Sequence, residues 1–290
     1  MKKMIVAAIF IIVVVGIVFS LKEVRGKSFE KKISFAVDSV EEIEVNNESW
    51  NVEFKNTESK KVTITAEGKQ KDKKNAPVAI KNDGKKMIVN QQDQKGGFIE
   101  GFSFGKKGTI YISIPKAGVD TITLNNSSGD IKINDIKTKN VVFSNRSGVQ
   151  KIEGLFAEKG KFSSKEGELS LKDSSVEELS VSSTIGDNYI TNVTTSKLKA
   201  TSIDGEVSIK DIKEEKSLFI ETKSGDIVVS YNKAPTSLKI TASSNSSDIT
   251  VNLAGFKKKT NTEKLKEGTI GDALNKVELL SKQGTININS

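Results

Sequence analysis

Side chains that could carry out covalent or acid–base chemistry are few in this sequence. The 290 residues include no Cys and no His. Their absence excludes thiolate nucleophiles, iron–sulfur clusters, the usual zinc sites and Ser-His-Asp triads. A Ser-x-x-Lys pattern suits a Ser–Lys nucleophile pair, but its five occurrences are expected by chance in a chain so rich in both residues. The sequence therefore predicts a protein that is not an enzyme, with no catalytic residues and no cofactor.

Aspartates that recur after turns raise the possibility of calcium binding. They are Asp130, Asp187, Asp226, Asp248 and Asp272. Calcium-binding β-rolls need several carboxylate oxygens around each ion, which a much shorter Gly-Asp repeat supplies. One Asp in each repeat of nineteen residues or more supplies too few oxygens. We therefore expect no metal site.

Positive charge is concentrated in one part of the chain. Lys and Arg number 45 against 37 Asp and Glu, and only Arg25 and Arg146 are arginines. Base readout and phosphate clamping favour Arg forks, so a nucleic-acid partner is not expected. Residues 69–116 hold most of the excess, and residues 69–108 combine Lys with a Gly- and Phe-rich stretch.

The Lys- and Phe-rich excursion at 69–108 suggests a contact with the outer leaflet of a membrane or with an anionic wall polymer. The sequence favours a simpler alternative, in which the Phe residues cover the end of the fold and the Lys residues are merely solvated. The candidate contact residues are Lys69, Lys71, Lys73, Lys74, Phe98, Phe102, Phe104, Lys106 and Lys107.

The N-terminus contains one strongly apolar segment. Residues 4–21 carry no charge and, as a helix, would span roughly 27 Å, close to the thickness of a bilayer core. We predict a cytoplasmic tip at 1–3, an uncleaved transmembrane anchor at 4–21 and a juxtamembrane linker at 22–34. A cleaved signal peptide is the alternative, but the apolar run is long and no small-x-small site follows it. A signal-anchor would place the bulk of the chain outside the cell.

Glycines recur at a fixed interval along the second half of the chain. Steps of 19 residues separate the first five, and a step of 20 follows. Relative to each of the first six glycines, the residues at −5 and +4 are apolar in every unit. The predicted turn glycines, including one in a late copy, are Gly129, Gly148, Gly167, Gly186, Gly205, Gly225 and Gly284.

Each repeat unit reads as two short strands with alternating apolar residues, joined at a turn where Gly supplies a positive φ. A unit this small cannot bury its apolar face alone, so neighbouring units must stack. We predict an all-β fold: a parallel β-solenoid of about nineteen-residue coils following the anchor. An antiparallel meander is the alternative that the same alternation allows.

Further copies extend the array in both directions. Residues 40–54 match residues 119–133 at an offset of 79, with Trp50 in place of Gly129. We assign the first coils and the excursion to 35–118, and the repeat array with a C-terminal cap to 119–290. Polar residues 257–275 break the period and are expected to close the C-terminal end. Residues 28–66 are expected to cover the other end, because bare strand edges aggregate.

The repeat resembles a known group at this point. The runs SSGDIKINDI, IDGEVSIKDI and KSGDIVVS, with the late run EGTIGDALNKVELLSKQGTINI, resemble the bacterial putative-adhesin β-strand-repeat family, a domain of unknown function, over about residues 35–290. The anchor, the Lys content and the length are similar to LiaG-type envelope proteins of low-GC Gram-positive bacteria. The resemblance implies a membrane-bound protein of the cell envelope, linked to a stress system that responds to wall-active antibiotics. It implies no catalytic residues.

The function we expect is that of a single-pass, extracytoplasmic interaction or sensory accessory. Its expected partners are the membrane, other envelope-stress membrane proteins and anionic cell-wall polymer. A polymerising envelope scaffold or adhesin is the first alternative, and a glycan-active β-helix enzyme is the less favoured one.

Overall fold

The computed structural model describes residues 27–70, 75–92, 108–246 and 248–290. The predicted tip and anchor at 1–21 lie outside these residues, as does the linker up to residue 26. The described residues form no helix with the length and apolar character needed to cross a membrane.

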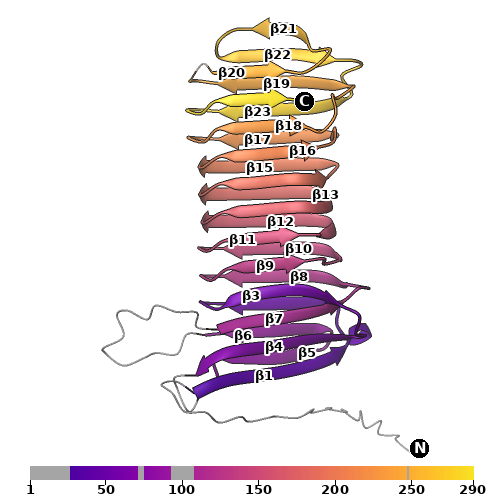
Figure 1. Ribbon diagram of the computed structural model, residues 1–290, viewed down its shortest axis with the longest axis vertical. Helices are drawn as coiled ribbons and strands as arrows, with labels where there is room; N and C mark the ends of the chain where they lie inside the picture. Colours follow the sequence, from indigo (N-terminus) through magenta and orange to yellow (C-terminus); the bar gives the residue numbers. More distant parts are fainter. Residues whose placement is uncertain (1–26, 71–74, 93–107, 247) are drawn as a thin grey trace, which may run out of the picture.

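Regular structure in these residues is β, apart from one short 3-10 turn, η1 (Val37–Ser39). The all-β prediction is therefore confirmed. Figure 1 shows the strands stacked into a rod. The strands are β1 (Lys27–Ala36), β2 (Glu42–Asn47), β3 (Asn51–Thr57), β4 (Lys61–Gln70), β5 (Val78–Asp83), β6 (Lys86–Gln91), β7 (Gly108–Pro115), β8 (Val119–Asn126), β9 (Ile131–Asn134), β10 (Thr138–Asn145), β11 (Gln150–Glu153), β12 (Phe156–Glu166), β13 (Leu169–Ile185), β14 (Asn188–Thr194), β15 (Lys197–Asp204), β16 (Val207–Ile212), β17 (Ser217–Thr222), β18 (Ile227–Tyr231), β19 (Leu238–Ser244), β20 (Ile249–Asn252), β21 (Lys257–Asn261), β22 (Leu265–Ile270), β23 (Asn275–Ser281) and β24 (Ile286–Asn289).

Residues nineteen positions apart in the sequence lie opposite each other on adjacent strands. Phe143 of β10 lies opposite Leu124 of β8 and Phe162 of β12, and all of these pairings are parallel. On the other face, Ile152 of β11 lies between Ile133 of β9 and Leu171 of β13. Each unit thus gives one strand to each of two faces and forms one coil. An antiparallel meander does not describe these strands.

The apolar columns of the two faces meet to form the core. Every residue predicted at −5 and +4 from the first six glycines is buried. Phe143 packs between Phe54 and Phe162, with ring centroids 5.7 and 5.6 Å apart. Phe143 and Phe162 occupy equivalent positions of successive coils and contact each other along the rod axis, whereas Phe54 reaches Phe143 from the opposite face of the stack.

The early copy pairs as its offset predicts. Val45 of β2 lies opposite Leu124 of β8, and Phe54 of β3 lies opposite Ile133 of β9. On their other edges β2 and β3 pair in parallel with β6 and β7. The coil that comes first in the chain therefore lies second in space, inside the stack.

The late copies also depart from chain order. The last coil, β23 and β24, pairs on one side with β17 and β18 and on the other with β19 and β20. It therefore lies between two coils that precede it in the sequence. A repeat period predicts that coils stack, but it carries no information on the order in which they do so.

Antiparallel strands lie at both ends of the stack. At one end β4 pairs with β7, β1 pairs with β4, and β5 pairs with β6. At the other end β22 pairs with β19 and β21 pairs with β22. The exposed lysines Lys257, Lys258 and Lys259 of β21 lie at that edge, and charge on an edge strand disfavours pairing with another chain.

Turn glycines are required for two reasons. Gly129, Gly148, Gly167, Gly186 and Gly205 have φ between +100° and +143°. At each, a Cβ atom would also overlap the carbonyl oxygen of the equivalent residue in the preceding coil. Gly225 and Gly284 do not have a positive φ, so for them the predicted reason was wrong. Only the close approach of the neighbouring turn excludes a side chain there.

Replacing Gly167 by Ala should destabilise the stack. The new Cβ would overlap the Gly148 carbonyl oxygen at a φ of +127°, and strain of this kind costs at least about 2 kcal/mol. Gly84→Ala is the matched control, because its φ is +63° and no atom lies within 4 Å of the added Cβ; it should cost about 1 kcal/mol. Urea unfolding measures both. Equal losses of stability would contradict the close-approach argument.

Truncating the chain after Asp272 should unfold strands β19–β22 at the C-terminal end of the stack. In the described structure, β19–β22 pair with the rest of the stack only through β23 and β24. We expect residues 238–270 to become protease-sensitive, and a synthetic peptide of residues 275–290 to restore protection in trans. The peptide should not affect the full chain. Undiminished protection in the truncated chain would show that β19 can pair with β17 directly.

Candidate binding groove

A buried polar column runs beneath the turn that contains the repeat glycines. It is formed by the residue three positions before each turn glycine or its equivalent. Asn126 Nδ2 donates to the Gly129 carbonyl oxygen at 2.9 Å and to Asn145 Oδ1 of the next coil at 2.7 Å. Apolar periodicity missed this column, although its signal is visible as a recurrence of Asn, Ser or Thr. Its members are Asn47, Asn126, Asn145, Ser164, Ser183, Ser202, Thr222, Ser244 and Ser281, all buried.

A second polar column lies on the outer surface, one residue earlier in each unit. We call it the amide–hydroxyl column, and its members lie opposite one another on adjacent parallel strands. At the usual strand separation it extends roughly 29 Å. It comprises Asn90, Asn46, Asn125, Ser144, Ser163, Ser182 and Thr201.

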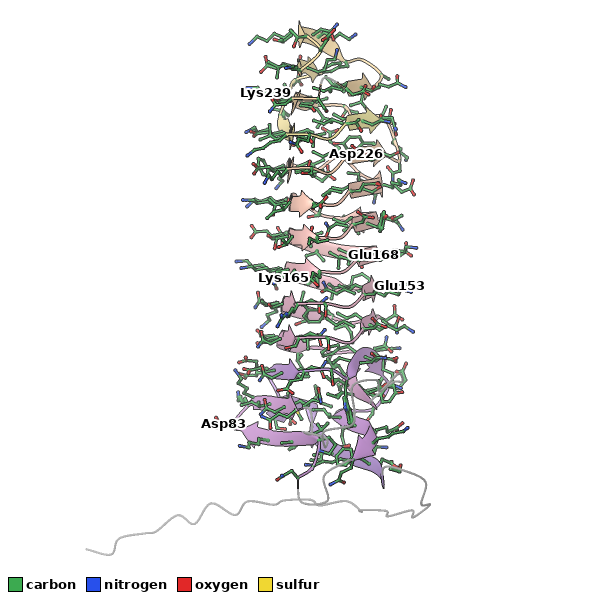
Figure 2. The ribbon with its side chains drawn as sticks, turned by 90° about the vertical axis from the view of Figure 1, so that its left-hand side faces the viewer. Asp83, Glu153, Lys165, Glu168, Asp226 and Lys239 are labelled. Atoms are coloured by element: carbon green, nitrogen blue, oxygen red, sulfur yellow. The ribbon has the colours of Figure 1, made fainter. Side chains whose placement is uncertain are left out.

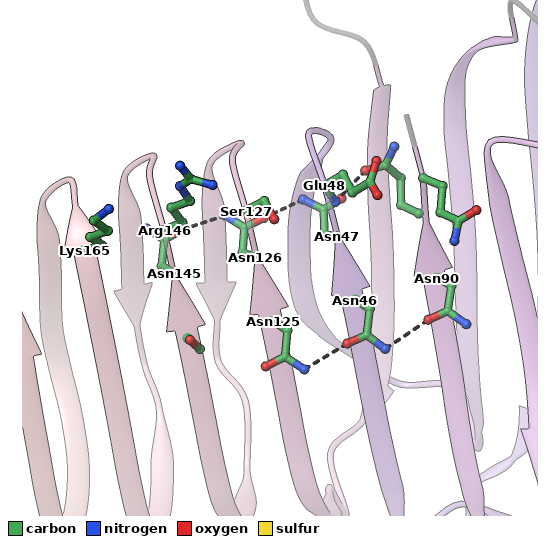
Figure 3. Close-up of a pocket in the computed structure, with 13 residues that line it drawn as sticks. Asn46, Asn47, Glu48, Asn90, Asn125, Asn126, Ser127, Asn145, Arg146 and Lys165 are labelled. Carbon is green, nitrogen blue, oxygen red and sulfur yellow. Dashed lines mark hydrogen bonds between the residues drawn. The ribbon is translucent and has the colours of Figure 1, made fainter. Parts of the chain in front are cut away.

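The amides of this column are hydrogen-bonded in one direction. Asn125 Nδ2 donates to Asn46 Oδ1 at 2.8 Å, and Asn46 Nδ2 donates to Asn90 Oδ1 at 3.0 Å (Figure 3). Within the described part of the chain, the side-chain oxygen Oδ1 of Asn125 accepts no hydrogen bond. This oxygen and the hydroxyl of the exposed Ser144 on the next coil are available to a ligand.

Two cations lie beside the column on neighbouring turns. Arg146 and Lys165 each stand two residues before a repeat glycine, on adjacent coils, and both are exposed (Figure 3). Neither forms an ion pair with a described residue. In the side view, side chains project in rows along the rod, and Lys165 lies on the side opposite Glu153 (Figure 2).

The asparagines of both columns, together with Ser144 and the two cations, line an open groove of about 470 Å³. At one end, Gln91 Oε1 accepts hydrogen bonds from the backbone N–H groups of Glu48 and Ser49, at 2.9 and 2.8 Å, and so holds the first turn in place. The described lining contains one carboxylate, that of Glu48, and no aromatic ring. This chemistry suits the binding of hydroxyl and anionic groups.

The groove does not contain the residues predicted for membrane or polymer contact. Of these, only Lys69 is described: it is exposed near the end of β4, where it pairs with Ser28 of β1. The other predicted residues lie outside the described part: Lys71, Lys73, Lys74, Phe98, Phe102, Phe104, Lys106 and Lys107.

Three of the five turn aspartates, Asp130, Asp187 and Asp226, accept backbone hydrogen bonds from a neighbouring coil. Asp130 Oδ1 accepts the backbone N–H of Val149 at 3.1 Å, and Asp226 Oδ1 accepts that of Thr285 at 2.7 Å. In each case a carboxylate binds the backbone of the coil stacked next to it. No three acidic residues of the described ranges are grouped so that they could hold a metal ion.

A buried carboxylate lies away from the groove, near the inserted last coil. Burial raises the pKa of Glu215 to about 8, and the charge of Glu214 adds to the effect. Neither of its carboxylate oxygens has a hydrogen bond to another described residue, and the buried Tyr231 hydroxyl also has none. Burial raises the pKa of Tyr231 as well. By contrast, Glu214 accepts hydrogen bonds from Thr236 and Asn275 and joins three segments of the chain.

Glu215→Gln should change how stability depends on pH. The carboxyl pKa rises from an ordinary 4.5 to about 8 on folding, so the native state binds the extra proton between these values. The contribution of this carboxyl to stability is fully present below pH 4.5 and is lost as the pH rises through 8, a loss of up to roughly 5 kcal/mol. Gln removes this loss, so the variant should be the more stable form at pH 8. Urea unfolding at pH 5 and pH 8 measures the difference, with exposed Glu221→Gln as control. If the difference in unfolding free energy between wild type and Glu215→Gln is the same at both pH values, the burial argument is contradicted.

Comparisons with known proteins support the fold. No protein with a curated description matches the sequence. A crystal structure of a putative adhesin from Bacteroides fragilis is 16% identical, with a TM-score of 0.55, over 90% of this chain and 96% of that chain. A putative adhesin from Parabacteroides distasonis is 16% identical (TM-score 0.45, 91% and 97% coverage). A putative lipid binding protein from Parabacteroides distasonis is 12% identical (TM-score 0.42, 92% and 99% coverage).

At these identities the likeness to the Bacteroides protein establishes the fold alone. Residues 40–289 match the family described as Toastrack DUF4097, which covers both the stacked coils and the strands at the C-terminal end. The resemblance to a β-strand-repeat family with adhesin-type members, inferred from the repeat, is therefore confirmed. The chain belongs to the Toastrack DUF4097 family.

Proposed function

We propose that the chain is a non-enzymatic, membrane-anchored protein of the cell envelope, whose rod projects outward as an interaction surface. One observation carries the proposal. Lys27, the first described residue, lies opposite Gln70, and Gly68 lies opposite Gly108. The chain that follows the predicted anchor and both borders of the Lys- and Phe-rich excursion thus meet at one end of the stack (Figure 1).

This arrangement supports a β1 end that is proximal to the membrane. An anchor at 4–21 leads through a short linker into β1, which pairs with β4. Lys69 then lies at the bilayer-facing end, and each Lys near an anionic surface contributes about 1 kcal/mol. The β21 end points away from the membrane.

We also interpret the stack as a parallel β-solenoid whose ends are closed by antiparallel strands. A closed rod of this kind holds surface columns at a constant separation, which suits a binding or sensory accessory better than a catalyst. A glycosidase needs two carboxylates flanking one bond, whereas the described groove lining contains Glu48 alone. The partners proposed for the rod are other envelope-stress membrane proteins and anionic cell-wall polymer.

A scaffold that polymerises end to end is the second candidate. It needs free strand edges at both ends, where parallel coils could continue from one chain to the next. The antiparallel β1, β4 and β5 at one end and β21 and β22 at the other work against such continuation. This architecture favours a monomeric rod.

The orientation is tested by vesicle binding of residues 22–290, which contain every described strand. Replacing Lys69, Lys71, Lys73 and Lys74 by Gln should weaken flotation with anionic vesicles by more than about tenfold, because the substitutions remove four positive charges that the proposal assigns to membrane contact. The control replaces Lys257, Lys258, Lys259 and Lys264 by Gln, which removes the same charge from the opposite end. The control should bind like wild type, and added salt should weaken all binding. Equal losses in both variants, or no loss in either, would argue against a membrane-facing β1 end.

A further inference from the structure

We propose that the groove binds one extended chain of a hydroxyl-rich anionic polymer. The polymer lies along the amide–hydroxyl column, and one of its anionic groups is held between Arg146 and Lys165. This inference rests on the proposed function, in that it takes the rod as an interaction surface, and it names the ligand class of that surface.

The direction of the ligand follows from the register. The strands cross the rod, so their equivalent residues form a line along its axis at steps of about 4.8 Å. Asn46, Asn125 and Ser144 are three consecutive positions of this line. A chain that presents hydroxyl groups at intervals can exchange hydrogen bonds with several steps at once, whereas a compact ligand reaches only one or two.

The column is held in place before any ligand binds. Beneath it, Asn47, Asn126 and Asn145 are bonded to one another and to the turn carbonyls. Each surface side chain directly precedes a buried one on the same strand, and Asn125 and Asn46 are further fixed by their mutual hydrogen bond. Little ordering cost therefore remains at binding, which favours a weakly contacting polymer.

The positive charges of Arg146 and Lys165 determine where along the groove the anionic group of the polymer binds. Arg146 presents a planar guanidinium that matches a phosphate or carboxylate, and Lys165 stands on the adjacent turn. Elsewhere on the rod, Lys139 and Lys197 are neutralised by Asp120 and Glu178 of neighbouring coils, at 2.9 and 2.8 Å. Arg146 and Lys165 have no such partner among the described residues.

Two features of the groove limit the choice of polymer. Its described lining has no aromatic ring on which a neutral sugar or a nucleobase could stack. The carboxylate of Glu48 lies at the other end, so negative charge is favoured only near Arg146. Hydroxyls at the asparagines and an anion at Arg146 are the combination that this lining accepts.

The test measures binding of the full chain, in nonionic detergent, to three polymers by titration calorimetry. The probes are poly(glycerol phosphate), polygalacturonate and neutral dextran. We expect an anionic polymer to bind and dextran not to bind. A preference for the first probe identifies a polyol phosphate and a preference for the second an acidic polysaccharide; either preference supports the inference.

Paired variants locate the site. R146Q/K165Q should weaken binding about tenfold, the effect of losing two exposed ion pairs. The matched control is K132Q/K151Q, which removes two exposed cations that pair in register on the opposite face and should stay within about twofold of wild type. N125A/S144A should weaken binding several-fold without changing its salt dependence, because no charge is lost. Thermal unfolding checks that all variants are folded.

The inference is overturned if dextran binds as tightly as the anionic polymers, if neither anionic polymer binds, or if the two double-charge variants lose binding equally. Its failure is separable from that of the proposed function. If R146Q/K165Q still binds purified cell envelopes and the vesicle experiment gives the expected result, the groove inference fails and the proposal of a membrane-anchored rod stands. If R146Q/K165Q loses polymer binding but the protein does not bind vesicles, the groove inference stands and the proposed orientation of the rod fails.

Discussion

Parallel hydrogen bonding between coils of equal length is the interaction on which the rest of this structure depends. Because equivalent strands pair at an offset of nineteen residues, every position recurs about 4.8 Å away in the same environment. At the turn this brings one backbone against the next so closely that a Cβ is excluded. It also buries the residue three positions earlier, which must then hydrogen-bond to the turn carbonyl. Glycine and the polar column are two consequences of one spacing.

The same spacing turns single surface residues into rows. A lone exposed asparagine has little significance, but Asn90, Asn46 and Asn125 in register form a bonded line, and Ser144 continues it. Likewise Arg146 and Lys165 are separated in the sequence yet stand on neighbouring turns. A stacked fold thereby builds an extended binding surface without a deep cavity. This surface is consistent with an interaction role and with the absence of His and Cys from the chain.

Closure of the stack is a separate problem, because a repeat has no natural end. Here strands outside the repeat pair antiparallel at each end, and the coils next to them are not in chain order. The insertion of β23 and β24 makes the last residues of the chain the connection between the array and its cap. Glu214 joins the segments that meet there, whereas Glu215 is buried without a partner. Stability at this junction therefore depends on pH.

Much of the fold was determined by the sequence alone, since apolar residues at a fixed period must share one core. The all-β class, the buried positions at −5 and +4, and the pairing of residues 40–54 with 119–133 all follow from the period. Tertiary structure decided what a period cannot encode. The order of the coils is set by long-range strand pairing, such as that of β23 with β17 and β19, and the groove depends on which coils become neighbours. Asn90 lies beside Asn46 only because β6 pairs with β2, 44 residues away in the chain. No local sequence pattern predicts that contact.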